Sequence, residues 1–93
     1  MDYVLIIHSV KNYREWKKIF DGAATLRKNA GEQSYDVLRD ANDANTVIHF
    51  SKWSSIASAR AFFESAELVE IRRQAGVEAP AFHYLHLLEQ GSL

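Results

Sequence analysis

The hydrophobic positions of the chain form strand-like and helix-like patterns that alternate along its length. Short segments rich in β-branched and aromatic residues predict strands over residues 3–10, 33–39, 46–53 and 82–88. The first of them is apolar on both faces until His8 interrupts it. Because a strand that is apolar on both faces is covered on both faces, we expect this strand to have a packing layer on each side.

A helical pattern fills the interval between the first two strands. Apolar residues recur every three or four positions from Tyr13 to Leu26 and form one stripe. Asn12 and Glu15 have the spacing of a capping box, in which each side chain satisfies a free backbone N–H of the first turn. Gly31 tolerates the positive φ that commonly ends a helix. We therefore expect one continuous helix between Asn12 and Gly31.

Two further helical segments precede the last strand. The first begins after Ser54 or Ser55, whose hydroxyl groups are good N-caps, and the second runs from Ser65 to Gly76. Pro80 is incompatible with a helix interior, so it is predicted to stop the helical region and introduce the last strand.

The second and third strands are joined by the polar segment Asp40 to Asn45, whose Asp and Asn side chains are typical of a turn. The segment lacks the glycine and the distal glutamate of a calcium-binding EF-hand loop. The element order is then β-α-β-β-α-β, which predicts a ferredoxin-like α+β fold formed by one domain, residues 1–93. Right-handed crossovers give a four-stranded antiparallel sheet with the first and third strands central and the helices on one face.

The sheet face away from the helices is predicted to be apolar as well. Tyr, Leu, Ile and Phe residues occur on both sides of the strands at residues 3–10 and 82–88. A large apolar sheet face needs a cover, and no further segment of the chain is predicted to provide one. We therefore expect a homodimer in which a second copy, related by a two-fold axis, covers this face.

Composition narrows the classes of partner. The net charge is −1, from 11 basic and 12 acidic residues, so neither nucleic acid nor a membrane is an expected partner. The basic pairs Lys17–Lys18 and Arg72–Arg73 are predicted to be solvated helix surface. The longest apolar run, Val4 to Ile7, is far too short to span a bilayer. Without cysteine or a secretion signal, the protein is expected to be cytoplasmic.

Four segments carry a resemblance that covers residues 3–89. They are V-x-N-Y-x-x-W-K-x-x-F-D at residues 10–21, R-D-x-N-D-x-N at 39–45, F-x-K-W at 50–53, and F-F-E-S-x-E-L…A-G-V at 62–77. Together they resemble the dimeric α/β-barrel superfamily and, within it, small proteins similar to the antibiotic biosynthesis monooxygenases. The resemblance implies one cavity per subunit between the sheet and the helices. In oxygenase members, small aromatic or quinol-like substrates react there with oxygen without metal or flavin. Other members are isomerases, cyclases, haem degraders or decarboxylases, so the fold does not select the reaction.

One histidine and four aromatic residues are the candidate site. His8 interrupts an apolar strand, where a buried polar ring is unfavourable unless it is paired, and it matches the pattern of the family. We predict that His8 is a catalytic base or hydrogen-bond donor beside a cavity of a few hundred Å³. The predicted substrate-binding residues, which would form a flat apolar wall for a small aromatic ligand, are Tyr13, Trp16, Trp53 and Phe62. The alternative interpretation assigns these residues to the hydrophobic core.

The other histidines, His49, His83 and His86, are predicted to be partly buried sheet residues at the dimer face. A metal site would need two or three imidazoles to converge, and no carboxylate is placed to complete a set, so no metal is predicted. With only four glycines the chain has no nucleotide-binding motif, and no cofactor is predicted. Haem binding is disfavoured because no histidine lies on a predicted helix.

Three functions remain open at this point. The first is a cofactor-independent, monooxygenase-like enzyme that acts on a small aromatic or quinol-type compound, with His8 as the base. The second is a non-catalytic ligand-binding or accessory dimer, and the third is a cyclase or isomerase of the same superfamily. A second polar group that faces His8 inside the cavity would favour an enzyme over a binding protein.

Overall fold

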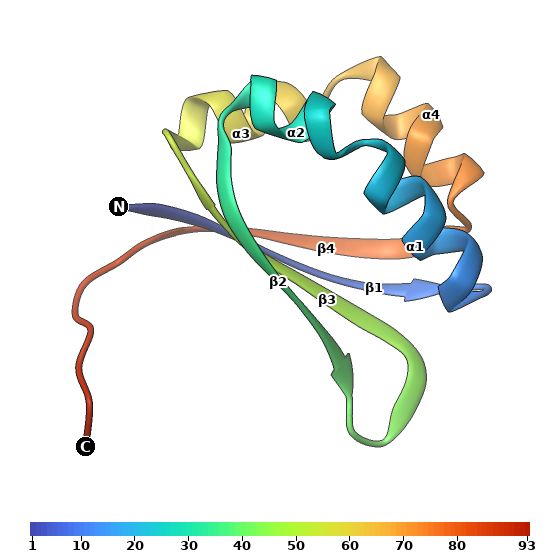
Figure 1. The fold of residues 1–93 in the computed structure, drawn as a ribbon, viewed down its shortest axis with the longest axis horizontal. Helices are drawn as coiled ribbons and strands as arrows, with labels where there is room; N and C mark the ends of the chain where they lie inside the picture. The colour runs from blue at the N-terminus through green and yellow to red at the C-terminus, as the bar shows by residue number, and fades with distance from the viewer.

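In the computed structural model, which describes residues 1–93, four helices lie on one face of a four-stranded antiparallel sheet (Figure 1). The elements are β1 (Asp2–Val10), α1 (Tyr13–Gly22), α2 (Ala24–Ala30), β2 (Glu32–Asp40), β3 (Asp43–Trp53), α3 (Ile56–Phe63), α4 (Ala66–Gln74) and β4 (Val77–His86). The strand order β2-β3-β1-β4 confirms the predicted ferredoxin-like topology with β1 and β3 central. None of the helices has the length and apolar character needed to cross a membrane.

The prediction of one continuous first helix is wrong, because the chain leaves helical geometry at Ala23 and forms α1 and α2. Gly22 precedes the break, and glycine weakens a helix interior. The carbonyl oxygen of Phe20 accepts hydrogen bonds there from the backbone N–H of Ala23 and from the guanidinium group of Arg27. The break therefore brings Arg27, on the second helix, into the interior of the protein, where it is 5% exposed.

The predicted helix starts are confirmed. The side chains of Asn12, Ser55 and Ser65 each accept a hydrogen bond from the backbone N–H three residues later, at 3.1, 3.0 and 3.2 Å. Gly31 and Gly76, with φ values of 125° and 74°, follow α2 and α4 closely in the left-handed region that favours glycine.

The strands extend further than their sequence patterns predicted. The turn between β2 and β3 consists only of Ala41 and Asn42, because the strands continue into the polar hairpin segment. β4 begins at Val77 and contains Pro80, which was predicted to precede it. β4 is an edge strand, where a proline is tolerated because one row of N–H groups has no partner to bind. A register shift between β1 and β4, together with a positive φ of 45° at Ala79, marks a bulge next to Pro80.

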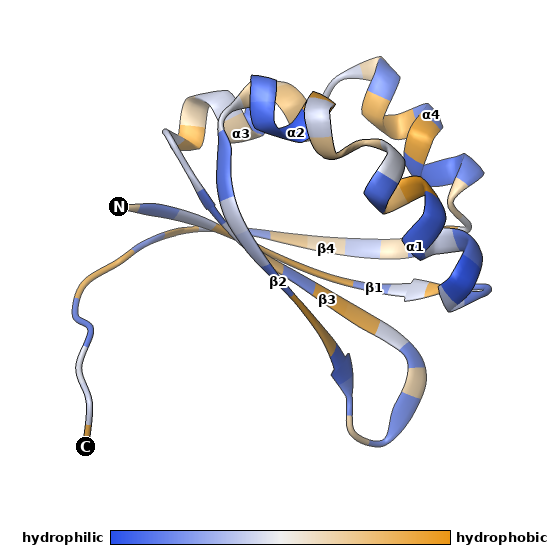
Figure 2. Cartoon of the chain, viewed as in Figure 1, coloured by the Kyte–Doolittle hydropathy of each residue, from blue (hydrophilic) through white to orange (hydrophobic).

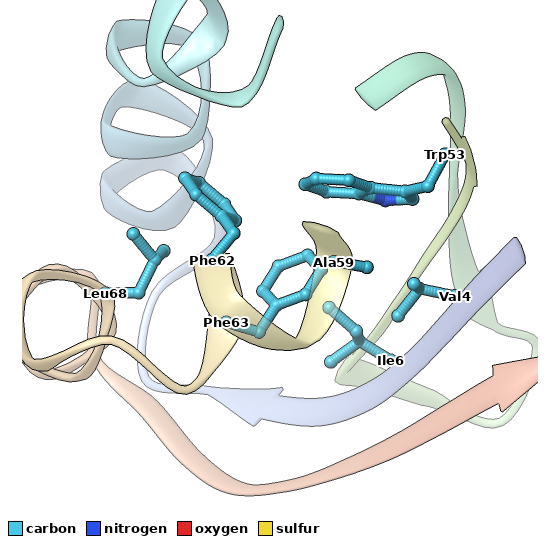
Figure 3. Packing of buried hydrophobic residues seen from close by; sticks show 7 residues of the cluster. All are labelled: Val4, Ile6, Trp53, Ala59, Phe62, Phe63 and Leu68. Atoms are coloured by element: carbon cyan, nitrogen blue, oxygen red, sulfur yellow. The ribbon is translucent and has the colours of Figure 1, made fainter. Parts of the chain in front are cut away.

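The face of the sheet under the helices carries two groups of buried side chains. The larger group joins β1, the end of β3, α3 and α4, and consists of Val4, Ile6, Trp53, Ala59, Phe62, Phe63 and Leu68 (Figure 3). The smaller group joins β1, β3, α1 and the end of α4, and consists of Val10, Trp16, Phe20, Val47 and Ala75. His49 lies between the groups, with its ring 4.9 Å from that of Phe20 and 6.4 Å from that of Phe63.

The opposite face of the sheet is apolar and has no helix over it, as the sequence predicted (Figure 1). Ile7 of β1 is 38% exposed and Leu38 of β2 is 51% exposed. The rings of Tyr3 and Phe50 stack on each other at 5.1 Å on the same face. Figure 2 shows hydrophobic residues along β3, whereas the tip of the β2–β3 hairpin is hydrophilic.

Candidate functional site

A cavity lies between the sheet and the helices, where the two groups of core residues meet. Its volume is about 70 Å³, several times the ~10–15 Å³ that one water molecule needs. This is smaller than the few hundred Å³ predicted, because core side chains such as Phe62, Phe63 and Leu68 also form its walls. Of the 15 lining residues, 11 are hydrophobic, and the other four are His8, Arg27, His49 and Arg72.

His8 lines this cavity from β1 and is 6% exposed. Its ring lies 5.5 Å from the ring of Trp16, and its Nε2 atom is buried without a hydrogen-bond partner. Burial, together with repulsion from His49 and Arg72, lowers the pKa of His8 to about 4. The imidazole is therefore neutral at pH 7, with a ring nitrogen that no protein group uses.

Arg72 lines the same cavity from α4, so the prediction that it is solvated surface is wrong. It lies one turn after the buried Leu68, which places it on the inward side of the helix. Its Nη1 atom is buried without a partner, and its guanidinium group lies 5.0 Å from the ring of Phe82. Burial lowers the pKa of Arg72, but an arginine stays charged in a protein. The neighbouring Arg73 is exposed, as predicted, and binds Glu70 on the surface.

A chain of three buried ionisable side chains also borders the cavity. Arg27 Nε donates to Glu32 Oε1 at 2.7 Å, and His49 Nε2 lies 2.9 Å from Glu32 Oε2. Burial alone would raise the pKa of Glu32, but the hydrogen bonds and charges of His49 and Arg27 outweigh it and hold that pKa below its usual range. The ionised carboxylate therefore compensates the charge of Arg27.

The arginine charges beside the cavity exceed the carboxylate charge by one. Two guanidinium groups, those of Arg27 and Arg72, are balanced by a single carboxylate, that of Glu32. His8 is neutral at pH 7 because of its low pKa. The carboxylate contacts Arg27 and His49, so the unbalanced charge is that of Arg72.

Three of the five predicted site residues line the cavity, namely His8, Trp16 and Phe62. The other two lie behind its walls. Tyr13 packs with its ring 5.8 Å from the ring of Trp16, and Trp53 packs within the larger core group, 5.5 Å from the ring of Phe62.

His49 was predicted at the dimer face, and that prediction is wrong. His49 pairs with Ile6 of β1 and lies on the helix side of the sheet. β3 is apolar on both parities, so its sequence alone could not assign His49 to a face. His83 pairs with Leu5 on the open face, and His86 lies at the sheet end with Nδ1 2.8 Å from a carboxylate oxygen of Asp2. No three His, Asp or Glu side chains converge in a way that could hold a metal ion.

Comparisons with known proteins show which family the chain belongs to. The model of the antibiotic biosynthesis monooxygenase family matches residues 12–74. The fold is similar to that of SnoaB, a cofactor-independent oxygenase from Streptomyces nogalater, with a TM-score of 0.77 and 11% identity over 96% of this chain and 94% of that one. It is also similar to a putative antibiotic biosynthesis monooxygenase from Caulobacter crescentus CB15, with a TM-score of 0.74 and 17% identity over 95% and 90% of the two chains. No curated protein matches the sequence. At these identities the likeness to solved structures establishes the fold alone.

Proposed function

Because the chain belongs to the antibiotic biosynthesis monooxygenase family, we propose that it is an enzyme that oxidises a small aromatic or quinol-type compound with O₂ and without a cofactor. The observation that carries the proposal is the buried, unpartnered Nε2 of His8 beside an apolar cavity. A buried polar atom without a partner is destabilising, so a ligand that bonds to Nε2 would stabilise the site. Arg72 is a second polar group in the same cavity, which favours an enzyme over a non-catalytic binding protein.

His8 acts as the base in this proposal. Its neutral imidazole accepts a proton from the substrate, and the resulting anion gives electrons to O₂. One oxygen atom becomes a new carbonyl on the substrate, while the other leaves as water with two hydrogen atoms of the substrate. The substrate supplies all the electrons, so no external reductant is needed.

The apolar lining holds the ring of the substrate and excludes water. Trp16 and Phe62 make the direct contacts, because they line the cavity. Tyr13 and Trp53 pack behind them and fix their orientation. This assignment divides the predicted substrate-binding residues into two that touch the ligand and two that support the wall.

The cavity widens when a ring binds. A cavity of about 150 Å³ can hold benzene, roughly twice the volume present here. α4 is the wall best suited to move, because Leu68 is the only buried residue of its nine. We propose that an aromatic ligand displaces α4 outward from the sheet.

The enzyme is a homodimer in this proposal, formed through the open apolar face of the sheet. Sedimentation of the wild-type protein at micromolar concentration should give a dimer. Ile7→Asp would place a charge in the contact and should give a monomer, whereas Val69→Asp, at an apolar residue that is 55% exposed on α4, should leave the dimer intact. A wild-type protein that sediments as a stable monomer would contradict the dimer.

Oxygen uptake with small quinols, from hydroquinone to dihydroxynaphthalene, tests the enzyme. His8→Ala should lower the rate roughly 100-fold or more, the usual contribution of a general base. His86→Ala is the matched control, because this side chain is 74% exposed and lies outside the cavity, with its Nδ1 atom 2.8 Å from Asp2. Circular dichroism should find both variants folded. An unchanged rate in His8→Ala would remove His8 from the mechanism.

A further inference from the structure

Two buried polar atoms in the protein have no neighbour to satisfy them, and both belong to residues that line the cavity. Four buried side-chain atoms lack a hydrogen bond, namely His8 Nε2, Glu32 Oε2, His49 Nε2 and Arg72 Nη1. The atoms of Glu32 and His49 lie 2.9 Å from each other, so each has a polar neighbour in the other. The atoms of His8 and Arg72 have no such contact, although both side chains line the same cavity.

We propose that His8 Nε2 and Arg72 Nη1 together hold an anionic oxygen of the ligand, either an ionised hydroxyl or a carboxylate on a small apolar body. This inference rests on the proposed function in taking the cavity as the ligand site. Arg72 donates to the oxygen as a permanent cation, which makes a charge-assisted hydrogen bond. His8 donates to an already ionised oxygen from Nε2 in the tautomer that carries its hydrogen there, and to a substrate hydroxyl after the ring has taken the proton of that hydroxyl.

The charges around the cavity favour an anion over a neutral group. Glu32 is the only lining or neighbouring carboxylate identified in the site, and both of its oxygens are used by Arg27 and His49. Arg27 also donates to the carbonyl of Phe20, so two of its donors are used and its charge is compensated by Glu32. Only Arg72 retains an uncompensated charge, and an anion would neutralise it in a site of low polarity.

The chemistry of the ligand body follows from the rest of the lining. Of the 15 residues around the cavity, 11 are hydrophobic, so a strongly hydrated inorganic ion would leave its water for apolar walls. An organic anion places its charged oxygen between His8 and Arg72 and its carbon skeleton against Trp16. The ligand class is therefore a small organic acid or an acidic phenol.

Matched pairs of probes test the preference for charge. Benzoate is compared with benzamide, and 4-nitrophenol above its own pKa is compared with 4-nitroanisole, by calorimetric titration of the wild-type protein. At least one anion should bind roughly tenfold or more tightly than its neutral match. A preference for benzoate assigns a carboxylate, whereas a preference for 4-nitrophenolate, followed by its visible absorption, assigns an ionised hydroxyl. Equal affinities within both pairs would overturn the proposal.

Two neighbouring arginines provide a matched set of variants. Arg72→Gln should weaken binding of the anion roughly tenfold and leave the neutral probe unaffected, and Arg72→Lys should restore much of the loss. Arg73→Gln removes the same charge one position away, where the side chain binds Glu70 on the surface, and should leave both affinities unchanged. Equal losses in Arg72→Gln and Arg73→Gln would reduce the effect to general electrostatics and overturn the site.

The outcome separates this inference from the proposed enzyme. An anion preference that depends on Arg72, in a protein that takes up no oxygen with any quinol, supports the anion site and contradicts the oxygenase. Oxygen uptake that depends on His8, without any anion preference, supports the oxygenase and contradicts the anion site. Failure of all four probes to bind, in a protein that also takes up no oxygen with any quinol, would contradict both.

Discussion

Two arginines border the same cavity and differ in what surrounds their charge. Arg27 and Arg72 both lie near an aromatic ring, with the guanidinium carbon 3.7 Å from the centre of Phe20 and 5.0 Å from that of Phe82. Arg27 is bound to Glu32 and to a backbone carbonyl, whereas Arg72 has a buried nitrogen without any partner. An arginine whose charge is compensated by a buried carboxylate holds the fold together, and one with a buried donor and no partner is available to a ligand.

The difference arises from the local sequence around each arginine. Glu32 follows Arg27 by five residues, across the turn at Gly31, and the turn returns the carboxylate to the guanidinium group. Glu70 lies only two residues before Arg72, but it binds Arg73 on the outer side of α4. The nearby carboxylate of α4 therefore pairs with the solvent-exposed Arg73, and Arg72 is left without one.

The largest expected loss of stability follows substitution of Arg27, the arginine that is paired with Glu32. Arg27→Gln would leave the carboxylate of Glu32 buried without one of its two partners, and should lower the free energy of unfolding by about 3–5 kcal/mol. Chemical denaturation followed by fluorescence measures this change. Lys17→Gln is a control, because its pair with Asp21 is exposed and should contribute under about 1 kcal/mol. Equal effects of the two substitutions would show that the buried pair is not structural.

As pH falls, the protein should lose the stability that depends on neutral His8 before it loses the stability that depends on ionised Glu32. The pKa of His8 is about 4 in the folded protein and about 6.5 in an unfolded chain. The unfolded state therefore binds more protons between these values, and about 2–3 kcal/mol of stability should be lost as pH falls from 6.5 towards 4. Glu32, whose pKa is lowered, contributes stability that is lost only at still lower pH.

Unfolding by urea at pH 7 and pH 5 measures this dependence. His8→Asn should flatten the slope between the two pH values, because it removes the group that is protonated on unfolding. His86→Asn, at an exposed position, should leave the slope as it is. A His8→Asn variant with the wild-type slope would mean that another group governs the acid sensitivity.

The smallest expected change in stability, without a ligand, follows substitution of Arg72, the arginine that has no carboxylate partner. Arg72→Met removes a half-buried charge that no carboxylate compensates, and should change the free energy of unfolding by about 1 kcal/mol or less, in either direction. Thermal denaturation of Arg72→Met beside Arg73→Met measures this. A loss as large as that of Arg27→Gln would mean that Arg72 is structural and would remove the contrast between the two arginines.

The sequence predicted the fold well because each element carries its own pattern. The order of the elements was predicted from the apolar pattern of β1 and from the helix caps at Asn12, Ser55 and Ser65. The break at Ala23 was missed because the apolar stripe continues across it. His8 was found because it interrupts an apolar strand. Such local signals depend only on neighbours in the chain.

The rest of the site could not be predicted because it depends on register and on contacts between distant elements. His49 lies in a strand that is apolar on both parities, so only its pairing with Ile6 assigns it to the cavity. Arg72 looked like half of a solvated basic pair, although its spacing from Leu68 was a signal that it faces inward. The partner of His49, Glu32, lies just before the predicted start of its strand, where no strand parity was assigned to it.

The bulge at Ala79 and Pro80 has a consequence for how copies of the protein can assemble. β4 is a free edge of the sheet, and an intact edge is a template on which strands of other molecules can add indefinitely. Pro80 has no N–H to offer an incoming strand, and the backbone bends at Ala79. The ladder of a fifth strand would therefore be interrupted midway along β4. This local irregularity protects the protein from polymerising sideways into fibrils, while leaving the broad face of the sheet free to pair.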